Sequence, residues 1–436
     1  MSEALFAVKS RMSSAAPRHA PPLLRERYDV LPLTGLVTRV FLQPPSPRFV
    51  DFAKVTVLRI GTLRSPTSHE SIRIQRSSKS KQRLPTPGSP DDTISRLRFS
   101  PTSTPFLAAS SWNGTTRVWK VDPAAGNATA VSLQTESTPV LDLTWLSDGG
   151  TIVYAGVGKL AYRWDLASER KEIVAAHNEP IRCTCEVSTV NSFATAGWDK
   201  RLRYWDIRSP TGNPLLDVQL SERAYAMDAR GPLMVLALAD RKIAIYDVRK
   251  PNAPYVERFT QLRYQTRCIA TWPDSMGYNV GSVEGKVGVE YVQPSKVDQS
   301  YSFFCHRDKQ GNSKAVNAIR FHQQSGAFCT ASNDGMVHFW DKDRRDRAPM
   351  RRFQKMGQAV CDVDFSSDGN MLAYAVGYDW IQGSAGRSNM ESTYVVLHSI
   401  EDGELHRARG GSGGYGGGGG GGRGRGRGGR RRGGRR

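Results

Sequence analysis

Three features of the sequence predict an all-β fold made of seven similar units closed into a ring. Short apolar runs are separated by Gly-, Asp- and Asn-containing turns, as in hairpin-connected strands. A seventh unit, Val360–Ile400, follows six units that each end near an aromatic residue. Those residues recur at intervals of 45, 41, 41, 45 and 49 positions, at Trp119, Trp164, Trp205, Tyr246, Tyr291 and Trp340. A period of about 40–45 residues is typical of a four-stranded blade, so we predict a seven-bladed β-propeller.

The clearest unit is Ala315–Asp343. Its apolar runs predict strands at Val316–Phe321, Phe328–Ser332 and Val337–Trp340, within a unit that has four strands in all. An Asn-Asp-Gly turn separates the last two of these runs, and the third ends at the Trp of a Trp-Asp dipeptide. Units with this ending resemble WD repeats, the blades of one large class of propellers.

The other units follow in order and diverge from this pattern in places. We place them at Asp91–Val121, Pro139–Leu166, a third unit around His177 and Trp205, Arg223–Arg249, and Arg267–Val292. The second unit has a Gly-Val-Gly turn instead of an acidic one, and the fourth and fifth end in Tyr246-Asp247 and Glu290-Tyr291. Seven such units can close a ring without free sheet edges.

Cysteine usage and hydropathy narrow the class of protein. All six cysteines lie within the stretch from the first to the last repeat, and none has the Cys-x-x-Cys spacing of a metal site. A reducing, intracellular location fits this usage. No run reaches the roughly 20 apolar residues of a membrane helix, and the start has no signal-peptide apolar segment. We therefore expect a soluble protein without membrane insertion, metal or cofactor.

The net charge of +20 belongs to the two ends of the chain. Residues 1–90 hold 15 Lys and Arg against 5 Asp and Glu, and residues 403–436 hold 10 Arg against one Glu. Residues 91–402 therefore carry a net charge of only +1. Attraction to nucleic acid is expected to be strongest at the ends.

Residues 1–89 are predicted to form a mostly disordered basic extension, and residues 90–402 the propeller. The extension is rich in Arg, Ser and Pro and ends in the polar run SSKSKQRLPTPGSP. Its exception is Phe49–Ile60, which is β-prone enough to add a strand to the last blade or to form a small helix.

Residues 403–436 are almost entirely Gly and Arg, so this tail is predicted to be disordered. Such segments bind RNA through phosphate contacts and guanidinium stacking, with little sequence preference. The arginines predicted to bind RNA are Arg423, Arg425, Arg427, Arg430, Arg431, Arg432, Arg435 and Arg436. A purely solubilising role is the alternative.

In the third unit, His177, Thr195, Asp199 and Trp205 fall where WD repeats place a hydrogen-bonded chain that ties an outer loop to an inner turn. The same residue types could form a catalytic triad. We favour the structural interpretation because a triad needs an exposed nucleophile and an oxyanion hole.

A long connection, Gln293–Lys314, is expected between the fifth and sixth units. It contains His306-Arg307-Asp308, which matches a kinase catalytic loop, but no phosphate-binding Gly-rich loop or Asp-Phe-Gly accompanies it. We expect His306 to cap the sixth unit as His177 caps the third. Arg307 would then lie on a loop at the rim that can touch a partner.

Several inter-blade motifs narrow the class further: SPDDTISRLRFSP, AGWDKRLRYWDIRSP, GSVEGKVGVEYVQP, FFCHR, FWDKDRR and AYAVGYDW. Together they resemble the Rae/Gle family of messenger-RNA export propellers, over about residues 90–402. The resemblance implies a scaffold without catalytic activity at the nuclear pore. Its partner would be a nucleoporin hairpin segment of the GLEBS type, which carries acidic residues.

The resemblance also implies which residues bind partners. Lys286 stands where the family has Arg, so it can pair with a carboxylate but not in a bidentate manner. A second family surface, an apolar slot with a charged border, corresponds to Phe303, Trp340, Asp341, Lys342 and Arg345. Trp340 would pack inside its blade in any case, whereas Phe303 and Arg345 are less easily explained as core.

Three other functions remain open. The related Bub-type propellers are spindle-checkpoint adaptors, whose partners would be checkpoint- or ubiquitin-related proteins. An RNA-binding protein with its specificity in the propeller is the second alternative. An enzyme is the third, although the sequence offers no metal constellation, phosphate loop or convincing carboxylate pair.

Overall fold

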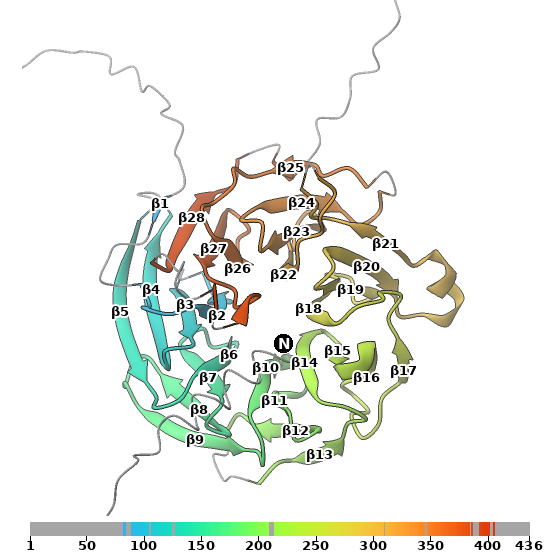
Figure 1. Cartoon of the computed structure of the whole chain (residues 1–436). Coiled ribbons are helices and arrows are strands. Elements are labelled where there is room, and N and C mark those ends of the chain that lie inside the picture. The colour runs from blue at the N-terminus through green and yellow to red at the C-terminus, as the bar shows by residue number, and fades with distance from the viewer. Residues whose placement is uncertain are drawn as a thin grey trace, which may run out of the picture. The chain divides into compact units, whose positions relative to one another are not determined.

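The computed structural model describes residues 82–83, 89–103, 106–123, 127–208, 213–308, 310–344, 347–383, 385–386, 392–401 and 404–405. Seven four-stranded antiparallel sheets stand around a common centre (Figure 1), so the predicted seven-bladed β-propeller is confirmed. Residues 1–81, which include Phe49–Ile60, and residues 406–436 lie outside the described part.

Each blade runs from an inner to an outer strand. The innermost strands are β2 (Ile94–Phe99), β6 (Val140–Trp145), β10 (Ile181–Val187), β14 (Ala224–Arg230), β18 (Thr266–Thr271), β22 (Val316–Phe321) and β26 (Ala359–Phe365). The second strands are β3 (Phe106–Ser111), β7 (Thr151–Gly156), β11 (Ser192–Gly197), β15 (Leu233–Leu238), β19 (Gly277–Ser282), β23 (Ala327–Ser332) and β27 (Met371–Gly377).

The third strands carry the closing residues of the repeats. They are β4 (Thr115–Asp122), β8 (Leu160–Asp165), β12 (Arg201–Asp206), β16 (Lys242–Asp247), β20 (Lys286–Tyr291), β24 (Val337–Asp341) and β28 (Tyr394–Ser399). The outer strands are β5 (Asn127–Thr135), β9 (Lys171–Ala176), β13 (Leu216–Gln219), β17 (Val256–Phe259), β21 (Tyr301–Phe304), β25 (Arg351–Arg352) and β1 (Gln82–Arg83).

The ring is closed by β1, an outer strand of only two residues. β1 pairs antiparallel with β28, with Gln82 opposite Leu397, so blade seven combines strands from both ends of the propeller. The pairing covers an edge of β28 that would otherwise be open. The closing strand comes from the polar run before the first blade, where the sequence predicted disorder.

Two predicted boundaries differ from the structure. The connection Gln293–Lys314 contains the 3-10 helix η3 (Pro294–Gln299) and β21, the outer strand of blade five. Beyond β28, Glu404 and Leu405 are buried, so packed chain continues past residue 402. The carboxylate of Glu404 lies 2.9 Å from Nε2 of His398, which attaches this segment to blade seven.

The closing residue of blade five is Glu290, one position before the predicted Tyr291. In blade six Trp340 pairs with Phe328, and the same register position in blade five pairs Glu290 with Tyr278. Glu290 is buried and accepts hydrogen bonds from the hydroxyls of Tyr278 at 2.7 Å and Thr260 at 2.6 Å. A polar network thus replaces the tryptophan that blades one, two, three and six have at this position.

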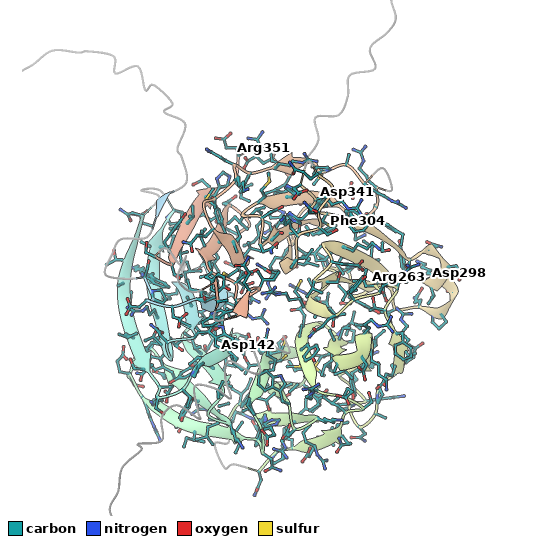
Figure 2. All side chains as sticks on the ribbon, in the orientation of Figure 1. Asp142, Arg263, Asp298, Phe304, Asp341 and Arg351 are labelled. Carbon is teal, nitrogen blue, oxygen red and sulfur yellow. The ribbon has the colours of Figure 1, made fainter. Side chains whose placement is uncertain are left out.

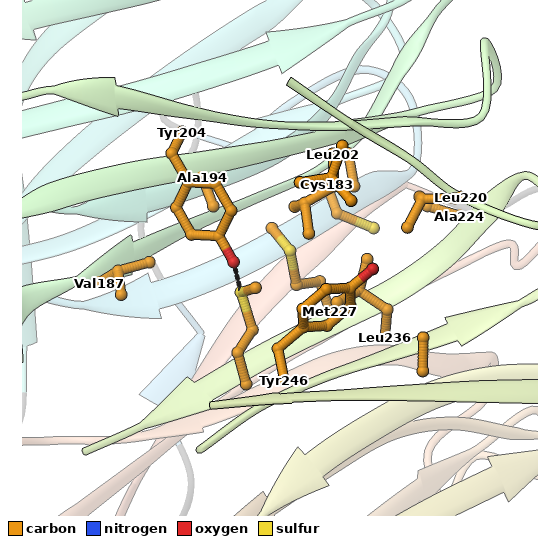
Figure 3. Close-up of a cluster of buried hydrophobic side chains, with 14 of the residues drawn as sticks. Cys183, Val187, Ala194, Leu202, Tyr204, Leu220, Ala224, Met227, Leu236 and Tyr246 are labelled. Carbon is orange, nitrogen blue, oxygen red and sulfur yellow. Dashed lines mark hydrogen bonds between the residues drawn. The ribbon is translucent and has the colours of Figure 1, made fainter. Parts of the chain in front are cut away.

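Apolar side chains fill the space between neighbouring sheets. Figure 3 shows the cluster between blades three and four, where Met227, Leu236 and Tyr246 face Leu202 and Tyr204. Each large side chain buried in this way contributes roughly 1.5–3 kcal/mol. Packing between blades, rather than within one, therefore holds the ring together.

Charged side chains of the inner strands pair across blades near the centre. Arg96 of blade one pairs with Asp142 of blade two, which Figure 2 shows beside the centre of the ring. Arg98 lies 2.9 Å from Asp362 of blade seven. Because both members of each pair are largely buried, removing one would leave an uncompensated charge.

All six cysteines are unpaired thiols within the described residues, and burial raises their pKa, that of Cys268 to about 12. The described part contains no group of His, Cys, Asp and Glu side chains that could hold a metal ion. None of its helices is long and apolar enough to cross a membrane.

Candidate docking surface

In blade three the four side chains singled out from the sequence are hydrogen-bonded in a row. His177 Nδ1 lies 3.0 Å from both carboxylate oxygens of Asp199, and its Nε2 lies 2.8 Å from Thr195 Oγ1. The indole N–H of Trp205 donates to the same hydroxyl at 2.8 Å. Because a carboxylate only accepts, His177 donates its Nδ1–H to Asp199.

The Asp199 carboxylate joins two loops of blade three. Burial by itself raises the pKa of Asp199. The hydrogen bond and charge of His177 and the backbone N–H groups of Asn178 and Arg201 lower the pKa by more, so the pKa of Asp199 is below its ordinary value. The Thr195 hydroxyl is fully buried. It therefore lacks the access to a substrate that a nucleophile needs.

Blade six contains the same network. His306 Nδ1 lies 2.9 Å from Asp334 and its Nε2 lies 2.8 Å from Thr330, which also accepts the Trp340 indole N–H at 2.9 Å. The prediction that His306 caps blade six is confirmed. His306 is fully buried and belongs to this network, which leaves Arg307 as the exposed member of the His-Arg-Asp run.

Lys286 and Arg307 lie over one aromatic ring. Lys286 Nζ is 4.6 Å, and the Arg307 guanidinium 3.3 Å, from the ring centre of Phe304. Lys286 Nζ also lies 3.5 Å from a carboxylate oxygen of Glu284. We call Lys286, Phe304 and Arg307 the blade-five corner. It presents two cations in a small area, which suits a partner that carries carboxylates.

Phe303 does not line an open slot. It is 6 % exposed and packs edge-on against Trp340, with ring centres 4.9 Å apart. From the sequence, Phe303 was less easily explained as a core residue. This interpretation was wrong, because Phe303 packs in the core. Alternation along β21 turns Phe303 inward toward blade six and leaves its neighbour Phe304 half-buried, beside the basic residues.

The other predicted partner-binding residues lie at the opposite end of β21. Tyr301 donates its hydroxyl to the backbone carbonyl of Lys342 at 2.7 Å. Lys342 Nζ lies 4.8 Å from the ring centre of Trp272 and 2.8 Å from Asp343. Asp341 accepts a backbone hydrogen bond from Asp343 at 2.9 Å. Tyr301 and Phe304 are about 10 Å apart along the strand, so the predicted residues form two clusters.

Some predicted residues lie outside the described part of the chain. They are Arg345 of the second cluster and the tail arginines Arg423, Arg425, Arg427, Arg430, Arg431, Arg432, Arg435 and Arg436. Sequence reasoning missed two residues that the structure singles out, Phe304 and Glu290. The departure of Glu290-Tyr291 from Trp-Asp was the only signal for the second.

Seven sheets with a repeated His–Asp–Thr–Trp network define a WD-repeat propeller. The family model described as WD domain, G-beta repeat, matches residues 80–120, 169–206 and 300–341. The last two of these matches contain the network residues of blades three and six.

Similar proteins identify the family within this class. The mRNA export factor GLE2 of Chaetomium thermophilum is 38 % identical over 71 % of this chain and 88 % of its own length. The Poly(A)+ RNA export protein of Schizosaccharomyces pombe is 36 % identical over 72 % of this chain and 90 % of its own. Protein Rae1 of Drosophila melanogaster is 36 % identical over 72 % of this chain and 92 % of its own length. The chain belongs to this Rae/Gle family of mRNA export factors.

Proposed function

We propose that this protein is a non-enzymatic scaffold for messenger-RNA export through the nuclear pore. The observation that carries the proposal is its 36–38 % identity to proteins named for RNA export, over 88–90 % of their lengths. In blades three and six, hydroxyl, imidazole and carboxylate groups of the types found in catalytic triads are buried and hydrogen-bonded to one another, which supports a structural role for them.

The blade-five corner is the proposed docking point for an acidic nucleoporin segment of the GLEBS type. Phe304 holds both Lys286 and Arg307, so the two cations are positioned before a partner arrives. Preorganised charges of this kind steer association and select acidic partners. The protein would then act in the nucleus and at the nuclear envelope.

We further propose that the tail adds contact with RNA or ribonucleoprotein. The ten arginines of residues 403–436 are interspersed with glycine, which leaves their guanidinium groups free to stack on bases and to contact phosphates. In this organisation the docking propeller includes β1 and the packed residues Glu404 and Leu405, the residues before β1 are an extension, and residues 406–436 are an RNA-binding tail.

A pull-down from nuclear extract with the full-length protein tests the docking proposal. The double variant Lys286→Glu/Arg307→Glu should lose a nucleoporin that the wild type captures, as read by mass spectrometry. Arg249→Glu is the matched control, because Arg249 is also exposed but is paired with Asp247 on blade four. Capture of checkpoint proteins without any nucleoporin would favour the Bub-type alternative instead.

A further inference from the structure

The outer strand of blade four carries an unusual group of exposed aromatic side chains. β17 is the outermost strand of this blade (Figure 1). Phe259, the last residue of β17 (Val256–Phe259), is 60 % exposed. Tyr255, the residue before the strand, is also 60 % exposed, and Tyr264, in the connection that follows the strand, is 58 % exposed. Exposed aromatic rings on an outer strand and on the connection that follows it are candidate contacts for a partner.

The register of β17 fixes the exposure of Phe259. Lys242 is opposite Phe259 and Ala244 is opposite Glu257, so alternation places Tyr255, Glu257 and Phe259 on one face. Arg258, on the other face, donates to the Tyr278 hydroxyl at 3.1 Å in the interface with blade five. Phe259 therefore cannot turn into the core without breaking this interface.

Two arginines accompany the exposed rings. The Arg241 guanidinium lies 5.8 Å from the ring centre of Phe259, and the backbone N–H of Thr260 donates to the Arg241 carbonyl at 3.0 Å. Arg263 is exposed next to Tyr264. Among the described residues, neither arginine forms an ion pair with a carboxylate, whereas Arg249 of the same blade lies 2.6 Å from Asp247.

The turn that presents Arg241 is strained. In η2 (Ala239–Arg241) both Asp240 and Arg241 have positive φ, 58° and 64°. Turns of this type favour Gly or Asn, and a bulky residue such as Arg is strained there. Backbone strain of this kind is concentrated at functional sites. We call Arg241, Phe259, Arg263 and Tyr264 the blade-four platform.

We propose that the blade-four platform binds single-stranded nucleic acid, with bases stacked on Phe259 and Tyr264 and phosphates held by Arg241 and Arg263. Aromatic faces next to unneutralised arginines are the combination that recognises unpaired bases on a charged backbone. A duplex would hide its base faces, and an apolar partner would leave both arginines without counter-charge. RNA is the member of this class that the proposed function supplies, so the choice of RNA rests on that function.

The platform differs from the tail and from the blade-five corner. It would give the propeller its own nucleic-acid contact, in addition to residues 403–436. It borders the corner at Arg263, whose backbone N–H donates to Glu284 at 3.4 Å. Its side chains are nonetheless separate from Lys286, Phe304 and Arg307, so the two surfaces can be altered one at a time.

Fluorescence anisotropy with the full-length protein tests the stacking role. The probes are a 20-nucleotide oligo(A) RNA, its DNA counterpart and an RNA duplex of equal length. The variant Phe259→Leu/Tyr264→Leu keeps apolar bulk but removes the aromatic faces, and should bind both single strands at least about fivefold more weakly. Ile173→Leu, at a 52 % exposed position on β9, should bind like the wild type.

The same assay at several salt concentrations tests the phosphate contacts. Arg241→Gln/Arg263→Gln should reduce the slope of log affinity against log salt concentration by about 1.4, since each phosphate contact to a single strand contributes about 0.7. The control Arg208→Gln/Arg249→Gln removes two exposed arginines that are paired with Asp206 and Asp247, and should change the slope little.

Ultraviolet crosslinking to the oligo(A) probe, read by mass spectrometry, localises the contact. We expect crosslinked tryptic peptides Phe259–Arg263 and Tyr264–Arg267 besides tail peptides. Crosslinks confined to the tail, together with unchanged affinity of the leucine variant, would overturn the proposal. Nucleoporin capture by the same variant should stay normal, so a failure here leaves the docking proposal separately testable.

Discussion

At the scale of single residues, buried hydrogen-bond networks account for the side chains that most resemble catalytic groups. His177 and His306 occupy equivalent positions, and each joins an acidic turn residue to a buried threonine. Fully satisfied networks of this kind stabilise a fold, while partly satisfied ones destabilise it. The stability of the two blades should therefore depend on every member.

Removing one carboxylate tests this dependence. Asp199→Ala and Asp334→Ala should each lower the free energy of unfolding by about 1–3 kcal/mol, because the imidazole Nδ1–H loses its acceptor. Urea unfolding measures the change. Asp206→Ala is the control, since Asp206 caps only an exposed turn and contacts Arg208. Equal stability of Asp199→Ala and Asp206→Ala would contradict the network.

His338 predicts a dependence of stability on pH. Its ring stacks on His306 with centres 4.3 Å apart, and burial together with the charge of His306 lowers its pKa to about 3. Between about pH 6.5 and 3 the unfolded chain protonates this imidazole and the folded protein does not, so stability falls as pH falls. His338→Gln should flatten this decline in urea unfolding between about pH 6 and 4.

Asp364 also contributes to the pH dependence of stability, with a sign opposite to that of His338. Burial raises its pKa to about 7, so the folded state retains a proton that the unfolded state releases, and this part of the stability falls as pH rises. Because Asp364 is present in both proteins, its effect cancels when His338→Gln is compared with the wild type. An unchanged acid profile of the variant would show that His338 titrates normally.

The sequence identified these networks but not which way every side chain points. The motif spacing placed His177, Asp199, Thr195 and Trp205 correctly relative to one another. It could not distinguish Phe303 from Phe304, because the face that each occupies depends on the register of β21 against β20, and a shift of one residue exchanges the two.

At the scale of elements, the first three strands of each blade could be predicted and the fourth could not. The second strands are buried on both faces and read as apolar runs, as in β15 and β23. Outer strands lack this signal: both residues of β25 are exposed, and β21 lay inside an expected connection. The two residues of β1 stood in a polar run.

Truncation tests the contribution of β1. Removing residues 1–78 leaves β1 in place, whereas removing residues 1–88 opens the edge of β28. We expect the longer truncation to lower the melting temperature by several degrees and to make β28 susceptible to limited proteolysis. If both truncations melt at the same temperature, β1 does not close the ring.

At the scale of the whole molecule, the positive charge is concentrated in the two ends of the chain, and the propeller is nearly neutral. The net charge of +1 over residues 91–402 gives the propeller little bulk attraction for acidic partners or RNA. The docking and RNA contacts that we propose therefore depend on local groups, the blade-five corner and the blade-four platform. Ring closure and the pairing of Arg96 with Asp142 depend on distant segments, and no local pattern predicts them.

Deleting residues 406–436 tests the proposed role of the tail. RNA affinity should fall at low salt and the salt dependence should become shallower, because the deletion removes ten arginines that can each contact a phosphate. Replacing these arginines with lysine is the control. It keeps the charge and loses the stacking, so the salt dependence should remain. Unchanged affinity after the deletion would leave the tail a solubilising role.

The distribution of polyadenylated RNA in cells tests the export function most directly. After depletion of the endogenous protein, in situ hybridisation should show polyadenylated RNA accumulating in nuclei. The wild type and Arg249→Glu should restore the normal distribution, and Lys286→Glu/Arg307→Glu should not. Normal RNA distribution after complete depletion would contradict a function in messenger-RNA export.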